Sequence, residues 1–266
     1  DCDLPRIVVA HSDVVSWWTA VHDAEPPHSD WIREYRQNVE RGWRAADLVI
    51  APTAWMLSEA CRHYGEPRSK TLVYNGRDPR GFSADQAKQG YAVSVGRLWD
   101  AGKQASLLLR NDLPLLTILV GSAQSPQGAV ASAQSSRNYP KLRMLGPQSE
   151  VQLQQLFARA SLYIATSRYE PFGLAPLEAA LSRCALVAND IPSLREVWED
   201  AAVYFATNNA QELLLTIQEL ASNPRQVREY ADRAYERART VLNSDRMAEE
   251  YLALYRSLVC TEVAAA

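Results

Sequence analysis

The chain has few cysteines and no long hydrophobic run. Its four cysteines lie far apart in the 266 residues, at positions 2, 61, 184 and 260, and no two of them form a CxxC pair. This spacing argues against a zinc site or a disulfide framework and is typical of reduced thiols in a cytosolic protein. No apolar stretch reaches the length that spans a bilayer, so we expect no transmembrane helix. The N-terminus also lacks the basic and apolar segments of a secretory signal.

A strong charge of either sign is missing as well. The net charge of −3 gives no general electrostatic reason to expect a nucleic-acid partner. The 11 glycines include no GxGxxG, which argues against an oxidoreductase of the dinucleotide-binding type. The one D-x-D pair, Asp1 and Asp3, lies at the extreme terminus, a poor place for a metal-diphosphate site. We therefore predict no bound metal and no cofactor.

What is present is an alternation of short apolar and longer mixed segments. With 47% hydrophobic residues the chain can bury a core, and its length predicts one large or two ordinary domains. Residues 1–80 contain three apolar runs that we interpret as buried strands, namely Arg6–Ala10, Asp47–Ala51 and Lys70–Tyr74. Turn and capping residues predict helices between these runs, over about 30–44 and 54–64.

The Trp-rich segment 14–21 leaves two interpretations open. Its apolar residues cannot all face one core if the segment is a helix. Either the helix packs on two sides, or Trp17 or Trp18 lines a cleft. The polar, aperiodic stretch from Arg77 to Gly90 is predicted to be a linker.

Beyond the linker, apolar runs alternate regularly with helical patterns. Six strands are predicted, at 91–96, 115–120, 142–146, 162–166, 185–188 and 202–205. This alternation is typical of a parallel, doubly wound sheet in an α/β fold. Three helices are predicted to close the chain, at Ala210–Ala221, Pro224–Val241 and Arg246–Val259. The conformation of the Ser122–Ser136 loop stays open.

The most informative stretch follows the run at 162–166. It passes through a turn containing Pro and Gly into a predicted helix that begins near Leu174. The first N–H groups of such a helix have no partners and bind anions. Glu170 in the turn and Glu178 about one turn into the helix flank this site, and carboxylates accept hydrogen bonds from hydroxyl groups. A ligand with phosphate in the middle and polyols at both ends, such as a nucleotide sugar, fits this pattern.

A second stretch places two cations after another strand. The run at 91–96 ends at Gly96, and Arg97 and Lys103 follow it. Doubly wound sheets bind their ligands at the carboxyl ends of the strands. An arginine fork and a lysine charge that converge there suit a diphosphate.

Together these motifs resemble the retaining GT-B glycosyltransferases of family 4, also called group 1 glycosyltransferases. The resemblance rests on Gly96-Arg97 with Lys103, on Asn75-Gly76 before the linker, and on Glu170 and Glu178 at E-x7-E spacing. It extends from His11 to the final helix and is strongest across 92–205. It implies a GT-B-like α/β fold in which two Rossmann-like domains are joined.

The resemblance also implies the role of each site residue. Arg97 and Lys103 would hold the donor diphosphate, and the backbone amides around Phe172, Gly173 and Leu174 would join them. Glu170 would contact the transferred sugar, and Glu178 the ribose hydroxyls. His11 looks like the family's histidine beside the reacting sugar; a structural histidine that ends a strand is the alternative. The reaction would transfer a hexose from a UDP-, GDP- or ADP-sugar with retention of anomeric configuration.

The sequence departs from the family pattern in its first 80 residues. The glycine-rich loop that normally follows the first strand is absent, and only three strands are predicted there. We therefore expect a partial N-terminal, acceptor-side domain at 1–80, braced by the C-terminal helix 243–266, and a complete donor domain at 81–242. Exposed strand edges predict self-association or a partner chain that completes the small sheet.

Two functional classes remain: an active hexosyltransferase, and a partner-dependent or non-catalytic module that binds a nucleotide sugar. The sugar, the base and the acceptor, whether a glycan, a lipid or a small molecule, are not determined by the sequence. We expect a cytoplasmic protein, with peripheral contact at the inner membrane face if the acceptor is a lipid.

Overall fold

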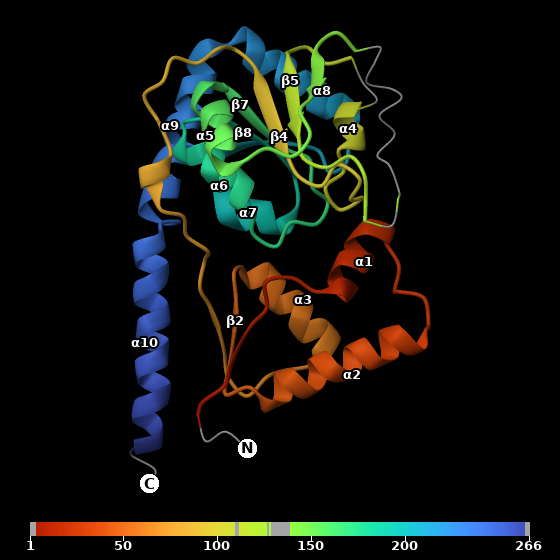
Figure 1. Ribbon diagram of the computed structural model, residues 1–266, viewed down its shortest axis with the longest axis vertical. Coiled ribbons are helices and arrows are strands. Elements are labelled where there is room, and N and C mark those ends of the chain that lie inside the picture. Colours follow the sequence, from red (N-terminus) through yellow and green to blue (C-terminus); the bar gives the residue numbers. More distant parts are fainter. Residues whose placement is uncertain (1–3, 110–111, 127, 129–138, 264–266) are drawn as a thin grey trace. The chain divides into compact units, whose positions relative to one another are not determined.

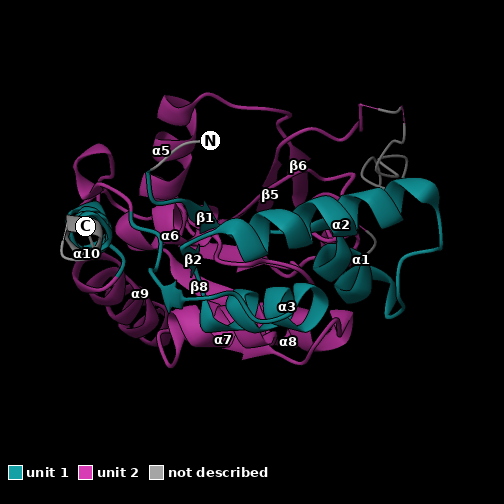
Figure 2. Ribbon diagram, turned by 90° about the horizontal axis from the view of Figure 1, so that it is seen from below, with its two compact units in different colours: residues 1–76, 242–266 teal, residues 77–241 magenta. Residues whose placement is uncertain are grey.

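The computed structural model describes residues 4–109, 112–126, 128 and 139–263, with side chains described up to residue 259. The Asp1–Asp3 segment and much of the Ser122–Ser136 loop lie outside the described residues. The chain divides into two compact units, coloured separately in Figure 2. Unit 1 contains residues 1–76 and 242–266, and unit 2 contains residues 77–241.

Unit 1 is built on a small parallel sheet with the strand order β1-β2-β3. Its strands are Ile7–Val9 (β1), Leu48–Ala51 (β2) and Lys70–Leu72 (β3). The helices are Val14–His22 (α1), Asp30–Ala45 (α2), Ala54–Tyr64 (α3) and Ser244–Val263 (α10). The side chains of Asp13, Ser29 and Thr53 cap α1, α2 and α3, because each accepts a hydrogen bond from a first-turn N–H group.

Helices cover both faces of the central strand β2. On one face Val49 and Ala51 pack with side chains of α1, α2 and α3, among them the buried Trp43 and Met56. On the other face the residues Leu48 and Ile50 pack against α10, which contributes Met247, Tyr251, Leu254 and Leu258. Burying a side chain of this size contributes about 1.5–3 kcal/mol. The C-terminal helix is therefore part of the core of unit 1.

Unit 2 contains a parallel sheet of six strands with the order β6-β5-β4-β7-β8-β9. Figure 1 labels four of them, β4, β5, β7 and β8. The strands are Ala92–Val95 (β4), Thr117–Val120 (β5), Leu142–Met144 (β6), Leu162–Ala165 (β7), Ala185–Asn189 (β8) and Ala202–Phe205 (β9). The helices are Ser106–Leu109 (α4), Glu150–Arg159 (α5), Leu174–Leu181 (α6), Pro192–Trp198 (α7), Ala210–Ser222 (α8) and Pro224–Thr240 (α9), with a 3-10 turn at Pro79–Gly81 (η1).

The strand order of unit 2 reverses between β4 and β7. From β4 the chain proceeds outward through β5 to β6 and then returns to β7, which pairs with β4 on its other side. The loops that follow β4 and β7 therefore leave the same edge of the sheet in opposite directions. Such a point of reversal is where doubly wound sheets bind ligands.

The observed elements confirm the predicted fold class. There are two parallel sheets of α/β type, the N-terminal one is the smaller, and each strand lies within or next to a predicted run. The last helix, α10, begins at Ser244 and continues to Val263, so it is longer than the predicted Arg246–Val259. The segment 14–21 is helical, with Val15 and Val21 buried and both tryptophans half-buried. Residues 77–80, which we expected in the N-terminal domain, belong to unit 2.

Candidate functional site

Backbone hydrogen bonds join the loops that follow β4 and β7. The backbone N–H of Arg168 donates to the carbonyl oxygen of Gly102 at 2.9 Å. The hydroxyl of Thr166 donates to the carbonyl oxygen of Lys103 at 2.8 Å. The first bond joins main chain to main chain and the second joins a side chain to main chain, so both hold the backbone of the two loops together at this edge. The two sequence stretches singled out above therefore meet in one place.

Lys103 and Glu170 form the centre of this edge. The Lys103 Nζ atom lies 2.5 Å from Oε2 of Glu170, and the Ser167 hydroxyl donates to the same oxygen at 2.9 Å. The Lys103 side chain is 26% exposed and that of Glu170 is 14% exposed. A Cβ atom at Gly96 would lie 3.3 Å from Cγ of Lys103, so the glycine leaves room for the lysine stem at the strand end.

The hollow at this edge is small. Its volume is about 10 Å³, and Gly96, Lys103 and Ser167 contribute to its lining. This is roughly the volume that one water molecule requires. A ligand would therefore bind over these side chains and not inside the hollow.

Helix α6 begins beside the same pair. Its N-cap, Gly173, has φ +93°, a left-handed conformation that favours glycine. A Cβ atom there would lie 2.9 Å from Cγ of Pro176 and 3.3 Å from Cγ of Glu170. No side chain in the described part of the chain caps α6, so its first N–H groups are open to an anion. Phe172 is buried just before the helix, and Leu174 is exposed at its start.

Arg97 makes contacts different from those the sequence suggested. Its guanidinium lies 2.6 Å from the buried carboxylate of Asp100 and over the ring of Trp99, and its side chain is 62% exposed. Asp100 in turn accepts a hydrogen bond from the N–H of Gly102 at 2.8 Å. The described contacts do not bring Arg97 to Glu170. Of the two cations predicted to converge, Lys103 is thus the one that the described contacts place beside Glu170.

Glu178 faces a cation that the sequence analysis did not identify. The Nε atom of Arg77 lies 3.1 Å from Oε1 of Glu178, and Nη2 lies 2.6 Å from Oε1 of Glu150 at the start of α5. Burial raises the pKa of Glu178, whereas the positive charge of Arg77 lowers it and the negative charge of Glu150 raises it further. Arg77 therefore links Glu178 in α6, the carboxylate predicted to bind ribose, to Glu150 in α5.

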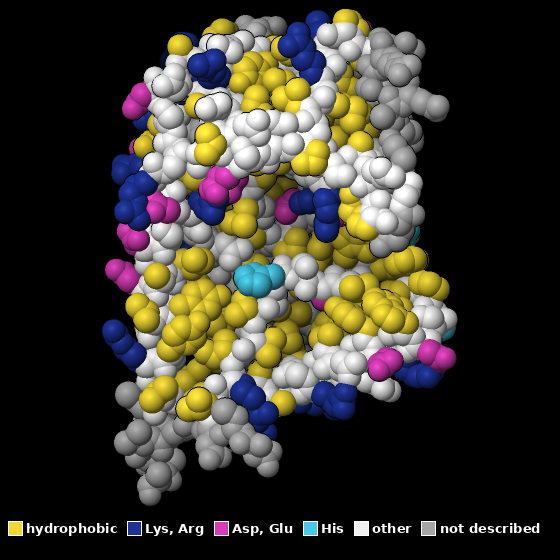
Figure 3. Space-filling view, viewed as in Figure 1, with side chains coloured by type: hydrophobic (Ala, Val, Ile, Leu, Met, Phe, Trp, Pro, Cys, Tyr) yellow, Lys and Arg dark blue, Asp and Glu magenta, His cyan; other side chains and the backbone are white. Residues whose placement is uncertain are grey.

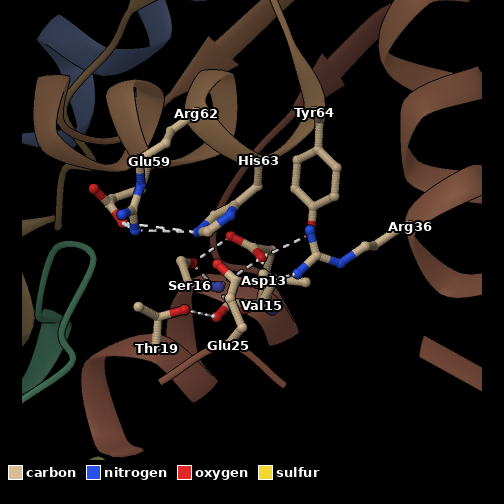
Figure 4. A network of polar contacts seen from close by, with 10 residues as sticks. All are labelled: Asp13, Val15, Ser16, Thr19, Glu25, Arg36, Glu59, Arg62, His63 and Tyr64. Atoms are coloured by element: carbon tan, nitrogen blue, oxygen red, sulfur yellow. Dashed lines mark hydrogen bonds and ion pairs between the residues drawn. The ribbon is translucent and has the colours of Figure 1, made fainter. Parts of the chain in front are cut away.

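His11 lies in unit 1, at the end of β1, and is exposed. Its N–H donates to the carbonyl oxygen of Val9 at 3.2 Å. The following residues are held by Asp13, whose Oδ1 accepts hydrogen bonds from the N–H groups of Val15 and Ser16 and from the hydroxyl of Tyr64. Figure 4 shows this network. Burial and the negative charge of Asp13 raise the pKa of Tyr64, so the phenol remains a donor. The end of β1 is thereby fastened to α1 and α3.

The face of the molecule in Figure 3 carries charges of both signs. Lys or Arg side chains lie among Asp or Glu side chains along its left margin. The net charge of −3 agrees with this mixture. Attraction of a diphosphate must therefore come from individual groups such as Lys103 and the start of α6.

The described residues contain neither a metal-binding cluster nor a membrane-spanning helix. No group of three or more His, Cys, Asp or Glu side chains in that part of the chain could hold a metal ion. None of the helices described is long and apolar enough to cross a membrane. A separate groove of about 680 Å³ lies at the amino ends of β4 and β5, and none of the predicted site residues lines it.

Sequence reasoning missed Arg77, Ser167 and Asp13. Ser167 lies within the motif after β7, three positions before Glu170 in the sequence, and this spacing could have indicated its contact with Glu170. Asp13 precedes a helix and fits the N-cap pattern. Arg77 carried no local signal, because its partners are Glu150 and Glu178, far along the chain.

Comparison with known proteins identifies the family of the chain. The family described as "Glycosyl transferases group 1" matches residues 86–241. An alpha-maltose-1-phosphate synthase of Mycobacterium tuberculosis is 25% identical over 96% of this chain and 74% of its own length. The structure of a sucrose-phosphate synthase from Thermosynechococcus elongatus aligns with a TM-score of 0.79 at 18% identity, over 96% of this chain and 68% of that one.

A second solved structure is that of Anabaena Alr3699/HepE in complex with UDP-glucose. It aligns with a TM-score of 0.76 at 20% identity, over 96% of this chain and 72% of that one. At these identities the structural likeness establishes the fold alone. The family match covers more than half of the chain and includes every predicted site residue except His11. The chain belongs to the group 1 glycosyltransferases, the retaining GT-B family that uses nucleotide sugars.

Proposed function

We propose that this chain transfers a hexose from a nucleoside-diphosphate sugar to an acceptor with retention of anomeric configuration. The observation that carries the proposal is the meeting of Lys103 and Glu170 beside the uncapped start of α6. The Lys103 ammonium suits a diphosphate, the Glu170 carboxylate suits sugar hydroxyls, and the start of α6 adds backbone N–H donors for the diphosphate.

The Lys103 ammonium has three N–H donors, and Glu170 uses one of them. The other two are available to donor phosphate oxygens. Glu170 keeps Oε1 for the hydroxyls of the transferred sugar, since Lys103 and Ser167, its hydrogen-bond partners among the described residues, both contact Oε2. The exposed guanidinium of Arg97 would contribute a further charge by leaving Asp100 for the diphosphate.

The chemistry follows from charge development. The bond between the anomeric carbon and the donor phosphate oxygen breaks, and the leaving diphosphate gains negative charge. The acceptor oxygen forms its bond on the same face of the sugar and passes its proton to a donor phosphate oxygen. Lys103, Arg97 and the amides of α6 stabilise the growing charge, and one such contact is worth about 3 kcal/mol. His11 would contact the reacting sugar from unit 1.

A second candidate function is binding of a nucleotide sugar without turnover. The arrangement of Lys103, Glu170 and α6 lies wholly within unit 2. This unit therefore contains these groups for binding a nucleotide sugar without a residue of unit 1. Such a module would bind the donor and leave its glycosidic bond intact.

A donor-turnover assay separates the two functions. The full chain would be incubated with UDP-glucose first, as the relative Alr3699/HepE was solved with it. GDP-mannose and ADP-glucose would follow, and release of nucleoside diphosphate would be measured. Proton NMR of the released or transferred sugar reports the anomeric configuration. Turnover that is lost in Lys103→Ala and in Glu170→Ala supports the enzyme. Donor binding without turnover, even with a glycan acceptor mixture, supports the binding module.

A further inference from the structure

We infer that Arg77 is a positioning residue of the nucleotide site: it directs the Glu178 carboxylate toward the ribose hydroxyls of the donor. The inference rests on the proposed function, because it takes Glu178 as the group that binds ribose. Arg77 itself is not among the residues that the family resemblance supplied. It is the first residue of unit 2 and lies at the start of the segment that leads to β4.

One guanidinium bridges two helices. Its Nη2 atom lies 2.6 Å from Oε1 of Glu150, the first residue of α5, and its Nε atom lies 3.1 Å from Oε1 of Glu178 in α6. The side chain of Glu178 is 16% exposed and that of Glu150 is 65% exposed. A planar guanidinium holds its N–H donors in fixed directions toward two carboxylates, whereas a lysine ammonium on a flexible stem fixes their positions less well.

The contact with Glu178 leaves the carboxylate usable. Nε is close to Oε1 but is not aligned for a hydrogen bond, so the contact is an ion pair. An ionised carboxylate has about four lone-pair sites on its two oxygens. Oε2 of Glu178 and the remaining sites on Oε1 can therefore accept hydrogen bonds from vicinal ribose hydroxyls while Arg77 stays in place.

The charge of Arg77 also favours the ionised form of Glu178, which accepts hydrogen bonds. Three titratable groups face this carboxyl: Arg77 from the connecting segment, Glu150 from α5 and Tyr163 from β7. Burial raises the pKa of Glu178 and Glu150 adds to that rise, so Arg77 is the group that opposes both. Burial raises the pKa of Tyr163 as well, and its phenol stays neutral.

The pH dependence follows from these directions. Ribose binding needs the ionised carboxylate, so affinity is complete above the pKa of Glu178 and declines as the pH falls through it. Without the positive charge of Arg77 this pKa is higher still. In Arg77→Met the loss of affinity must therefore begin at a higher pH than in the unchanged chain. An arginine that only tied α5 to α6 would not move this profile.

The experiment is isothermal titration of the full chain between pH 5.5 and 8.5. UDP, GDP and ADP are tested first, and the tightest of them is compared with its 2′,3′-dideoxy analogue, which lacks the ribose hydroxyls. We expect Arg77→Met to weaken the nucleoside diphosphate about tenfold at neutral pH, as for loss of a charged hydrogen bond, and to leave the dideoxy analogue unchanged. Arg77→Lys restores the charge and is expected to recover the pH profile but only part of the affinity.

Two matched controls guard against a folding effect. Arg80→Met removes an exposed arginine of the same segment whose partner is Asp78, and it should bind normally. Glu150→Gln removes the second partner but leaves Arg77 beside Glu178, and it should keep the preference for ribose hydroxyls. The thermal midpoint of each variant is measured by circular dichroism.

The outcomes separate this inference from the proposed function. If the unchanged chain binds none of the three nucleoside diphosphates, the proposed function is wrong and this inference with it. If the chain binds one of them normally and Arg77→Met changes neither the affinity nor the pH profile, only the role of Arg77 is wrong. Equal losses for the natural and the dideoxy nucleotide would also overturn it, because the effect would not then involve ribose.

Discussion

The ammonium of Lys103 lies 2.5 Å from the carboxylate of Glu170, although 67 positions separate the two residues in the chain. The strand order explains this, since β4 and β7 are neighbours and their following loops are joined by backbone hydrogen bonds. The pair places a cation and an acceptor for hydroxyl groups within reach of one ligand. In a nucleotide sugar the diphosphate is bonded directly to the hexose, so one such ligand can contact both side chains.

Replacing Lys103 by alanine should lower the rate of donor turnover about a hundredfold, because the positive charge that stabilises the leaving diphosphate is lost. The measurement is release of nucleoside diphosphate at saturating donor. Lys141→Ala is the matched control, since that lysine is exposed in the same unit and donates to the carbonyl oxygen of Pro114. A Lys103→Ala variant with unchanged rate and affinity would count against the assignment of this site.

Gly173→Ala should reduce donor binding and destabilise unit 2 by roughly 1–3 kcal/mol, because it combines a strained φ with a clash. The added Cβ would lie 2.9 Å from Pro176. Gly146→Ala is the comparison: it also has a positive φ, +56°, but no atom lies within 4 Å of the added Cβ. Urea unfolding followed by tryptophan fluorescence and titration with UDP measure both effects. Equal behaviour of the two variants would show that the contact at Pro176 has no consequence.

Lys88→Met should lower the free energy of unfolding by about 2–3 kcal/mol, because buried carbonyl oxygens lose a charged donor. The Lys88 ammonium donates to the carbonyl oxygens of Phe157, Ala158 and Ser182, at distances of 3.3, 3.0 and 2.6 Å. These bonds fasten the segment before β4 to the ends of α5 and α6. Urea unfolding measures the loss, and Lys70→Met, at an exposed ion pair with Glu66, should change the free energy of unfolding much less.

Cys184 should resist alkylation in the native chain. Burial raises the pKa of Cys184 to about 11, with the charge of Lys88 acting in the opposite direction. At pH 8 the reactive thiolate is therefore scarce and enclosed. Iodoacetamide treatment with peptide mass mapping should leave Cys184 unmodified in buffer and modify it in urea. Rapid labelling in buffer would mean that the region between α5 and α6 opens readily.

The fold could be predicted because its signals are local. Each strand of unit 2 is a short apolar run bounded by turn residues, and the order of strands and helices then favours one sheet type. The turn at Gly173 and the two loops after β4 and β7 were found in the same way. In each case the residues that carry the signal are within about ten positions of one another.

The contacts of single side chains could not be predicted in this way. Arg97 was expected to converge with Lys103, yet its guanidinium pairs with the carboxylate of Asp100, which is three positions further along the chain. Arg77 looked like an ordinary linker residue, and its role depends on Glu150 and Glu178, which only the folded sheet brings near. A sequence pattern shows which groups reach an edge, and packing decides which of them pair.

Gly76 lies where the outgoing and the returning chain segments touch within unit 1. A Cβ atom at this glycine would lie 2.1 Å from the carbonyl oxygen of Asn243, and the guanidinium of Arg246 donates to the carbonyl oxygen of Tyr74 at 2.6 Å. The chain passes into unit 2 directly after Gly76 and comes back directly before Leu242. Both polypeptide connections therefore depart from a single spot on unit 1. A side chain at position 76 would therefore displace the outgoing and the returning segment of unit 1 together, so a single Gly76→Ala change acts on both connections at once.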